Sequence, residues 1–244
     1  MKEFVRKLLI LICVVVFAYS AFQLGKIFYG YYEIEHETEE MINEYVIEKE
    51  QDEGFTPLDR TIDFTKLLQR NSDVVGWLYI PDTKIDEAIL KRKTNDTYLR
   101  SDIDGKYNYA GSLFLDENNS KELTDINTII YGHNMKNGSR FHDVRYYIIN
   151  GKEYKDKHLN VYIYLPDGSV NVYEVFASAT IASDSDLYSI SNDYSQYIDK
   201  VLNVAKYKND VSSEEAPIIM LTTCHSSEEE QRYVVFARLK ENLK

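Results

Sequence analysis

The sequence predicts a mainly β domain of about eight strands, closed as a barrel or stacked as a sandwich, behind a transmembrane helix and two leading helices. Short apolar segments recur at fairly regular spacing after Asn71, and turn residues separate them. We divide the chain into three parts. Residues 1–32 form a cytoplasmic tail and anchor, residues 33–72 a helical lead, and residues 73–244 the β domain.

The amino-terminal part is predicted to anchor the chain in a membrane. Residues 8–25 carry no charge and are close to the minimum length for a spanning helix. Lys2, Arg6 and Lys7 precede them, so the positive-inside rule places the N-terminus in the cytoplasm and the remainder outside the cell. A cleaved signal peptide is the alternative, but the apolar run continues past the small residues at 18–21, which favours an uncleaved anchor.

Charge and cysteine content narrow the class of protein. The whole chain carries a net charge of −12, and without the four basic residues and one acidic residue before position 33 it carries −15. This balance argues against nucleic acid as a partner. Cys13 lies in the apolar segment, so Cys224 has no partner for an internal disulfide in the external domain. That pattern fits a Gram-positive surface better than an oxidising secretory compartment.

The elements follow in order along the chain. Helices are predicted at residues 32–53 and 59–71, with a break at 55–57. The predicted strands are residues 74–81, 85–90, 111–116, 127–131, 159–165, 169–182, 217–224 and 232–239. A short turn or helix is expected at 95–100, a hairpin turn at 166–168 and longer helices at 139–150 and 193–207. Gly151 is a candidate for the end of the first longer helix, and the second precedes the cysteine strand.

Cys224 stands where a predicted strand ends and a polar loop begins. A two-residue period places it on the same strand face as Thr222. Arg232 begins the next strand, and an antiparallel hairpin would bring the two residues together. A neighbouring guanidinium favours thiolate over thiol and can hold a developing oxyanion. A lone cysteine can also be a small buried hydrophobic residue, and the strand pattern alone leaves that alternative open.

Among the five histidines, His133 has the most suggestive position, in a glycine-flanked loop after a strand. His225 is adjacent to Cys224 but would point to the opposite side of the strand. A metal site formed by His133, His142 and Cys224 lacks the ligand spacing of zinc sites, so we expect no metal and no cofactor.

Several segments together resemble one known family. They are GWLYIP at 76–81, GSLFLD at 111–116, YGHNM at 131–135, LTTC at 221–224 and RYVVF at 232–236. In this order they resemble the sortases, the cysteine transpeptidases of Gram-positive cell surfaces. Two helices before the barrel and a helix inserted ahead of the cysteine strand are similar to class B, and the resemblance covers about residues 74–239. It implies an eight-stranded sortase-like β-barrel.

The resemblance also implies an activity. Cys224 would be the nucleophile, His133 the general acid and base, and Arg232 the group that aligns the substrate and stabilises the oxyanion. Four residues match positions that line the class B peptide groove: Asn95, Leu99, Tyr131 and Thr222. The substrates would be surface proteins with a C-terminal sorting motif, and the acceptor an amine of the peptidoglycan cross-bridge or its precursor. Ser226 stands where some class B members have an acidic residue, so a Cys-His-Asp triad is not supported.

Two other functions are compatible with parts of the sequence. The first is a cysteine endopeptidase or other hydrolase acting at the cell wall, although papain-like enzymes usually place the cysteine before the histidine in the chain. The second is a non-catalytic, membrane-tethered barrel that binds cell-wall components. It predicts an unreactive thiol and no convergence of His133 and Arg232 on Cys224.

Overall fold

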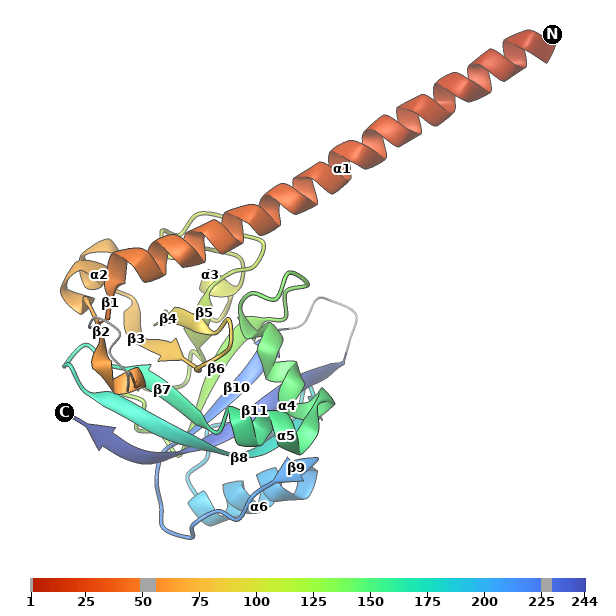
Figure 1. Ribbon diagram of the computed structural model, residues 1–244. Helices are drawn as coiled ribbons and strands as arrows, with labels where there is room; N and C mark the ends of the chain where they lie inside the picture. Colours follow the sequence, from red (N-terminus) through yellow and green to blue (C-terminus); the bar gives the residue numbers. More distant parts are fainter. Residues whose placement is uncertain (1, 49–55, 225–229) are drawn as a thin grey trace. The chain divides into compact units, whose positions relative to one another are not determined.

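The computed structural model describes residues 2–48, 56–224 and 230–244, without the side chain of Cys224 (Figure 1). The chain divides into two compact units, Met1–Glu39 and Glu40–Lys244. The first unit consists of most of helix α1 (Lys2–Tyr45). Among the described residues, α1 is the one helix long and apolar enough to cross a membrane, by a test that a signal sequence at this position would also pass.

The second unit is built on a closed β-barrel. Its strands in the described chain are β3 (Val74–Tyr79), β4 (Asp86–Leu90), β5 (Leu113–Leu115), β6 (Asn127–His133), β7 (Asn160–Tyr164), β8 (Val170–Ala182), β10 (Ile218–Cys224) and β11 (Gln231–Leu243). The order is β11-β10-β6-β5-β4-β3-β7-β8, and the pairing of β11 with β8 closes the ring. The two-residue strand β9 (Tyr207–Lys208) only extends the sheet from β8. The predicted eight-stranded barrel is confirmed.

Most neighbouring strands are antiparallel, but β6 runs parallel to β10 and β4 runs parallel to β5. Side chains alternate across this sheet, as expected for β-structure. Ile130 and Leu221 lie in the barrel interior with other buried aliphatic residues. Ile129 and Met220, one position earlier on the same strands, belong to a second apolar cluster outside the barrel. The site described below lies on this outer face.

Helix α6 (Tyr194–Val204) covers that outer cluster and lies beside β8 and β9 in Figure 1. Asp193 caps it, because its side chain accepts a hydrogen bond from the backbone N–H of Gln196 (2.9 Å). Its buried residues include Tyr197 and Val201. The one-turn helix η3 (Asp186–Tyr188) precedes it. The helix predicted at 193–207 is therefore present and ends three residues early.

The helix predicted at 139–150 is instead three short ones: η2 (Phe141–Arg145), α4 (Tyr146–Ile149) and α5 (Gly151–Lys157). Gly151 has φ 66° and stands at the junction of α4 and α5, so it ends one helix, as expected, and begins another. Helix α3 (Asp96–Leu99) and the hairpin turn at 166–168 agree with the sequence prediction.

The helical lead differs more from the prediction. Helix α1 ends at Tyr45 rather than at residue 53, because Val46–Glu48 (β1) pairs antiparallel with Arg60–Ile62 (β2). The 3-10 helix η1 (Pro57–Asp59) precedes β2, and α2 (Phe64–Arg70) begins only after its capping residue, Asp63. Residues 49–55, with the predicted break at 55–57 in part, lie outside the described chain.

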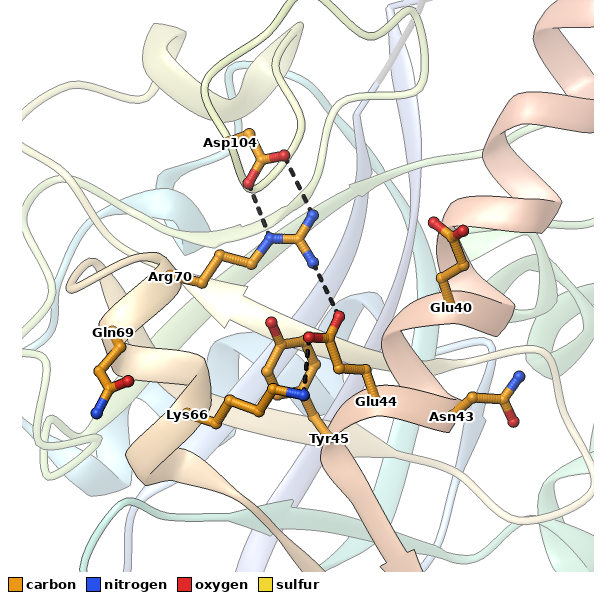
Figure 2. Close-up of a pocket in the computed structure, with 8 residues that line it drawn as sticks. All are labelled: Glu40, Asn43, Glu44, Tyr45, Lys66, Gln69, Arg70 and Asp104. Atoms are coloured by element: carbon orange, nitrogen blue, oxygen red, sulfur yellow. Dashed lines mark hydrogen bonds and ion pairs between the residues drawn. The ribbon is translucent and has the colours of Figure 1, made fainter.

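Charged side chains fix the last turn of α1 to α2 within the barrel unit (Figure 2). Lys66 Nζ lies 2.9 Å from Glu44 Oε1, and Arg70 Nε lies 2.8 Å from Asp104 Oδ1. Arg70 also approaches Glu44 (3.7 Å). These partly exposed pairs surround the buried ring of Tyr45 and orient α2, while apolar contacts beneath them supply most of the stability.

Candidate active site

The pairing of β6 with β10 brings the predicted cysteine and histidine together. The two strands are parallel, with Tyr131 opposite Thr222 and His133 opposite Cys224. Both strands end at the second of these pairs. His133 is therefore the last residue of β6, whereas the sequence had placed it in a loop. The difference matters, because a residue in a paired strand is held more rigidly than one in a loop.

Arg232 lies on the strand that flanks β10 on its other side. Strand β11 pairs antiparallel with β10 up to Thr222 and Val234. Beyond that pair, Thr223 Oγ1 accepts a hydrogen bond from the backbone N–H of Tyr233 (3.3 Å). Arg232 is half-buried, and its charge contributes to lowering the pKa of His133, so the two side chains share one electrostatic environment. The structure thus brings the three predicted catalytic residues to one edge of the barrel.

Two sequence predictions fall outside the described residues. His225 and Ser226 belong to residues 225–229. The direction of the His225 side chain therefore stays a prediction, and so does the inference from Ser226 that a Cys-His-Asp triad is not supported. Among the described residues, no group of three His, Cys, Asp or Glu side chains could hold a metal ion.

The imidazole of His133 is buried, with 7% of the residue exposed. Its Nε2 lies 2.8 Å from the backbone oxygen of Leu99. Gly132, the preceding residue, leaves no space for a side chain, because an added Cβ would lie 2.6 Å from Leu113 and 2.7 Å from Phe141. The glycine therefore allows β6 to pack closely against Leu113 and Phe141 at the position next to His133. Leu99, predicted to contact substrate, is in contact with His133 through its carbonyl group.

Burial lowers the pKa of His133, and the hydrogen bond to the Leu99 carbonyl opposes this effect. The positive charges of Arg100, Arg140 and Arg232 lower the pKa further. The site is thus electropositive within a chain whose net charge is −12. Such surroundings favour a neutral imidazole and stabilise anions, including a thiolate or an oxyanion.

Arg140 is also part of the loop that follows His133. It has φ 56°, forms a β-bridge with Asn134, and is 4% exposed. Its guanidinium forms a buried ion pair with Glu87 of β4. This pair attaches the loop after His133 to the neighbouring part of the barrel.

Two of the predicted groove residues lie side by side, two residue pairs away from His133 and on the same face of the sheet. Tyr131 Oη donates a hydrogen bond to Asp116 Oδ2 (3.0 Å), and its ring stacks between Phe114 and Tyr188, at centroid distances of 5.2 and 6.2 Å. Thr222 is fully buried, and its hydroxyl lies 2.9 Å from Tyr188 Oη. Tyr188 is a site residue that the sequence analysis missed, since it stands in a single helical turn without a recognisable motif.

Asn95 joins the same network from the start of α3. Its Nδ2 donates to Asp116 Oδ2 (2.9 Å), and its Oδ1 accepts from the backbone N–H of Glu117 (2.8 Å). Asp116 is thus the second residue that the sequence analysis missed. Its position at the end of a strand, in the GSLFLD segment, was the available signal. Leu99 is half-buried and packs against an apolar cluster that includes Trp77 and Phe114.

Fold and site together define a class of protein. The Sortase domain family matches residues 78–240, about two thirds of the chain. This chain belongs to the sortase family, whose members are cysteine transpeptidases.

The similar proteins are of the sortase B type. Sortase B of Listeria monocytogenes is 33% identical over 249 residues, which cover 98% of each chain. Sortase B of Bacillus anthracis in complex with AAEK1 superposes with a TM-score of 0.70 at 29% identity, covering 88% of this chain and 99% of that one. The Staphylococcus aureus sortase B–substrate complex gives 0.68 at 26% identity, covering 73% and 84%. The predicted class B resemblance is confirmed.

Proposed function

We propose that this transpeptidase cleaves the C-terminal sorting signal of surface proteins and transfers them to an amine of the cell wall, with Cys224 as nucleophile, His133 as general acid and base, and Arg232 as oxyanion-stabilising group. The observation that carries the proposal is the register of three adjacent strands. It places Cys224 opposite His133, with Arg232 on the other flanking strand.

The proposed reaction has two steps. In the first, the Cys224 thiolate attacks the scissile carbonyl carbon, the C–N bond breaks, and the leaving amine takes a proton from His133. In the second, the acceptor amine loses a proton to His133 and attacks the thioester carbonyl, which releases the thiolate. Each tetrahedral intermediate carries an oxyanion, which the Arg232 guanidinium would stabilise. The thioester conserves the energy of the cleaved peptide bond, so the transfer requires no ATP.

Burial and neighbouring arginines bear on the resting state of the pair. Because both lower the pKa of His133, a neutral imidazole is favoured in the free enzyme. The reactive form needs a thiolate together with a protonated imidazole. Arrival of the substrate carbonyl, and of negative charge developing on it, favours proton transfer from Cys224 to His133. The Leu99 carbonyl, hydrogen-bonded to Nε2, stabilises the protonated ring.

The peptide groove would run along the outer face of β6 and β10, past Tyr131, Tyr188 and Thr222 to Asn95. The stacked rings of Tyr131 and Tyr188 would form a wall of this groove, above the buried Thr222 hydroxyl. The apolar part of α1 would hold the enzyme in the cell membrane, with the N-terminus in the cytoplasm and the barrel outside. The S. aureus relative, described as a sortase B–substrate complex, supports a groove for substrate in this fold.

The function is tested with the residue 40–244 unit and a library of sorting-signal peptides. Mass spectrometry should detect a peptide-derived acyl group on Cys224, and an added amine should yield a ligated product. Cys224→Ala should remove both, with an unchanged circular dichroism spectrum, and Arg232→Lys should lower kcat strongly. Cys13 lies outside this unit and cannot contribute. Cleavage without ligation at any amine concentration would instead indicate a cysteine endopeptidase, and cleavage by Cys224→Ala would refute the assignment.

A further inference from the structure

Asp116 occupies an unusual position for a carboxylate, directly after β5 and with 5% of the residue exposed. Its backbone N–H donates to the carbonyl of Ile129 on β6 (3.0 Å), and its own carbonyl accepts from Lys91 Nζ (2.9 Å). The backbone on both sides of the side chain is therefore fixed, and the carboxylate has little freedom of its own.

The two oxygens of this carboxylate have different tasks. Oδ1 accepts hydrogen bonds from the backbone N–H and from Nδ2 of Asn118, at 2.9 and 3.0 Å, and so shapes the turn that follows β5. Oδ2 accepts from Asn95 Nδ2 (2.9 Å) and from Tyr131 Oη (3.0 Å). These four neutral donors fill the four acceptor positions of an ionised carboxylate.

Asn95 and Tyr131 belong to different elements, the start of α3 and strand β6, and both were predicted to line the peptide groove. One oxygen atom is their common point of attachment. Tyr131 is held at a second point by the rings of Phe114 and Tyr188, and Asn95 by the backbone of Glu117. A side chain held at two points keeps one rotamer. A groove formed by such side chains binds peptide without the entropy loss of ordering them.

We propose that Asp116 is the positioning residue of the peptide groove, acting on substrate binding through Asn95 and Tyr131 and not on the Cys224–His133 pair. This role rests on the proposed function. An amide in place of the carboxylate can accept through only one atom, so Asp116→Asn must turn an NH2 group either toward Asn95 and Tyr131 or toward Asn118. Asn95 Nδ2 and the N–H groups of Asn118 can only donate, so either orientation loses at least one hydrogen bond. The groove residues would then lose a fixed orientation.

The principal test compares Asp116→Asn with Asp125→Asn, using any peptide that the wild-type enzyme cleaves. Asp125 is a matched control, because its carboxylate accepts three hydrogen bonds from Ser120 and Asn119 in the same loop and contacts neither groove residue. Asp116→Asn should lower kcat/KM about 10- to 100-fold, mainly through a higher KM. The rate at which iodoacetamide alkylates Cys224, and its pH profile, should stay unchanged. Asp125→Asn should leave KM within about twofold.

A second variant separates positioning from loss of structure. Asn95→Ala combined with Tyr131→Phe keeps the carboxylate and should reproduce the KM effect, and adding Asp116→Asn to it should change KM less than about threefold. A full additional effect in that background would overturn the proposal, as would a fall in kcat at constant KM or an altered alkylation profile.

A crystal structure of Asp116→Asn decides the question without any substrate. Displaced Asn95 and Tyr131 side chains on an unchanged β5 and β6 are expected, and unmoved side chains would refute the positioning role. If the wild-type enzyme cleaved no sorting-signal peptide, the proposed function would fail, while this structure would still test Asp116.

Discussion

Replacing Gly111 by alanine should displace the carbonyl that holds His133. Gly111 has φ 56°, and a Cβ built there would lie 2.5 Å from the oxygen of Leu99 and 2.6 Å from that of Tyr98. The left-handed conformation alone costs an L-residue about 1–2 kcal/mol. The overlap involves backbone atoms that cannot rotate away, and such crowding adds about 1–3 kcal/mol. Gly111→Ala should therefore lower the free energy of unfolding by about 2–5 kcal/mol.

The matched control is Gly105→Ala in the same loop. Gly105 has φ 76° and no atom within 4 Å of its Cβ position, so it carries the conformational cost without the overlap. Urea denaturation at constant m-value should show the difference between the two variants. Because the Leu99 hydrogen bond raises the pKa of His133, an NMR titration should find that pKa lowered further in Gly111→Ala and unchanged in Gly105→Ala. Equal stability losses, or an unchanged His133 titration, would refute this reasoning.

Three further predictions concern stability. Burial lowers the pKa of His133 and His142 in the folded protein below the ordinary 6.5. Above that pH both histidines are neutral and do not reduce the free energy of unfolding. As the pH falls below it, the unfolded chain takes up protons more readily than the folded protein, and the free energy of unfolding decreases. The Tm should decline from neutral pH to about pH 5 in the wild type and less steeply in a double His→Asn variant. Glu87→Gln should cost about 3–5 kcal/mol in urea denaturation, because it removes the buried carboxylate that pairs with the Arg140 guanidinium. Adding Arg140→Met should recover much of that loss, and no recovery would contradict the cause. Leu221→Ala in the barrel interior should cost about 2–5 kcal/mol, and a loss below 1 kcal/mol would mean that the interior repacks.

The strands of the barrel were predictable because their signals are local. Period-two alternation and apolar runs identify all eight barrel strands, β3, β4, β5, β6, β7, β8, β10 and β11, and the Pro-Asp-Gly turn fixes the β7–β8 hairpin. The pairing of β1 with β2 was not predictable. Each strand has only three residues, which is too short for an alternating pattern, and a stretch of intervening chain separates the two. The barrel closure between β8 and β11, and the parallel register of β6 with β10, depend on contacts far apart in sequence.

The sequence indicated which residues are candidates for the site, but it did not indicate which contacts hold them in place. Cys224, His133 and Arg232 were predicted from the family resemblance, and the strand register brings them to one edge of the barrel, while their catalytic roles stay a proposal. The partner of His133 could not be predicted, since it is the backbone oxygen of Leu99, and every residue has one. Tyr188 was missed for a related reason. Its relation to Tyr131 depends on an insertion folding back over the barrel.

Strand β11 has a consequence for how the enzyme is made. It follows the seven other barrel strands in the sequence, pairs with both β10 and β8, and carries Arg232 near its start. Until β11 leaves the ribosome, the nascent sheet has two open edges, which are prone to pair with other chains. We expect activity to begin only when β11 docks and closes the sheet. Barrel closure and maturation of the active site would then be a single event.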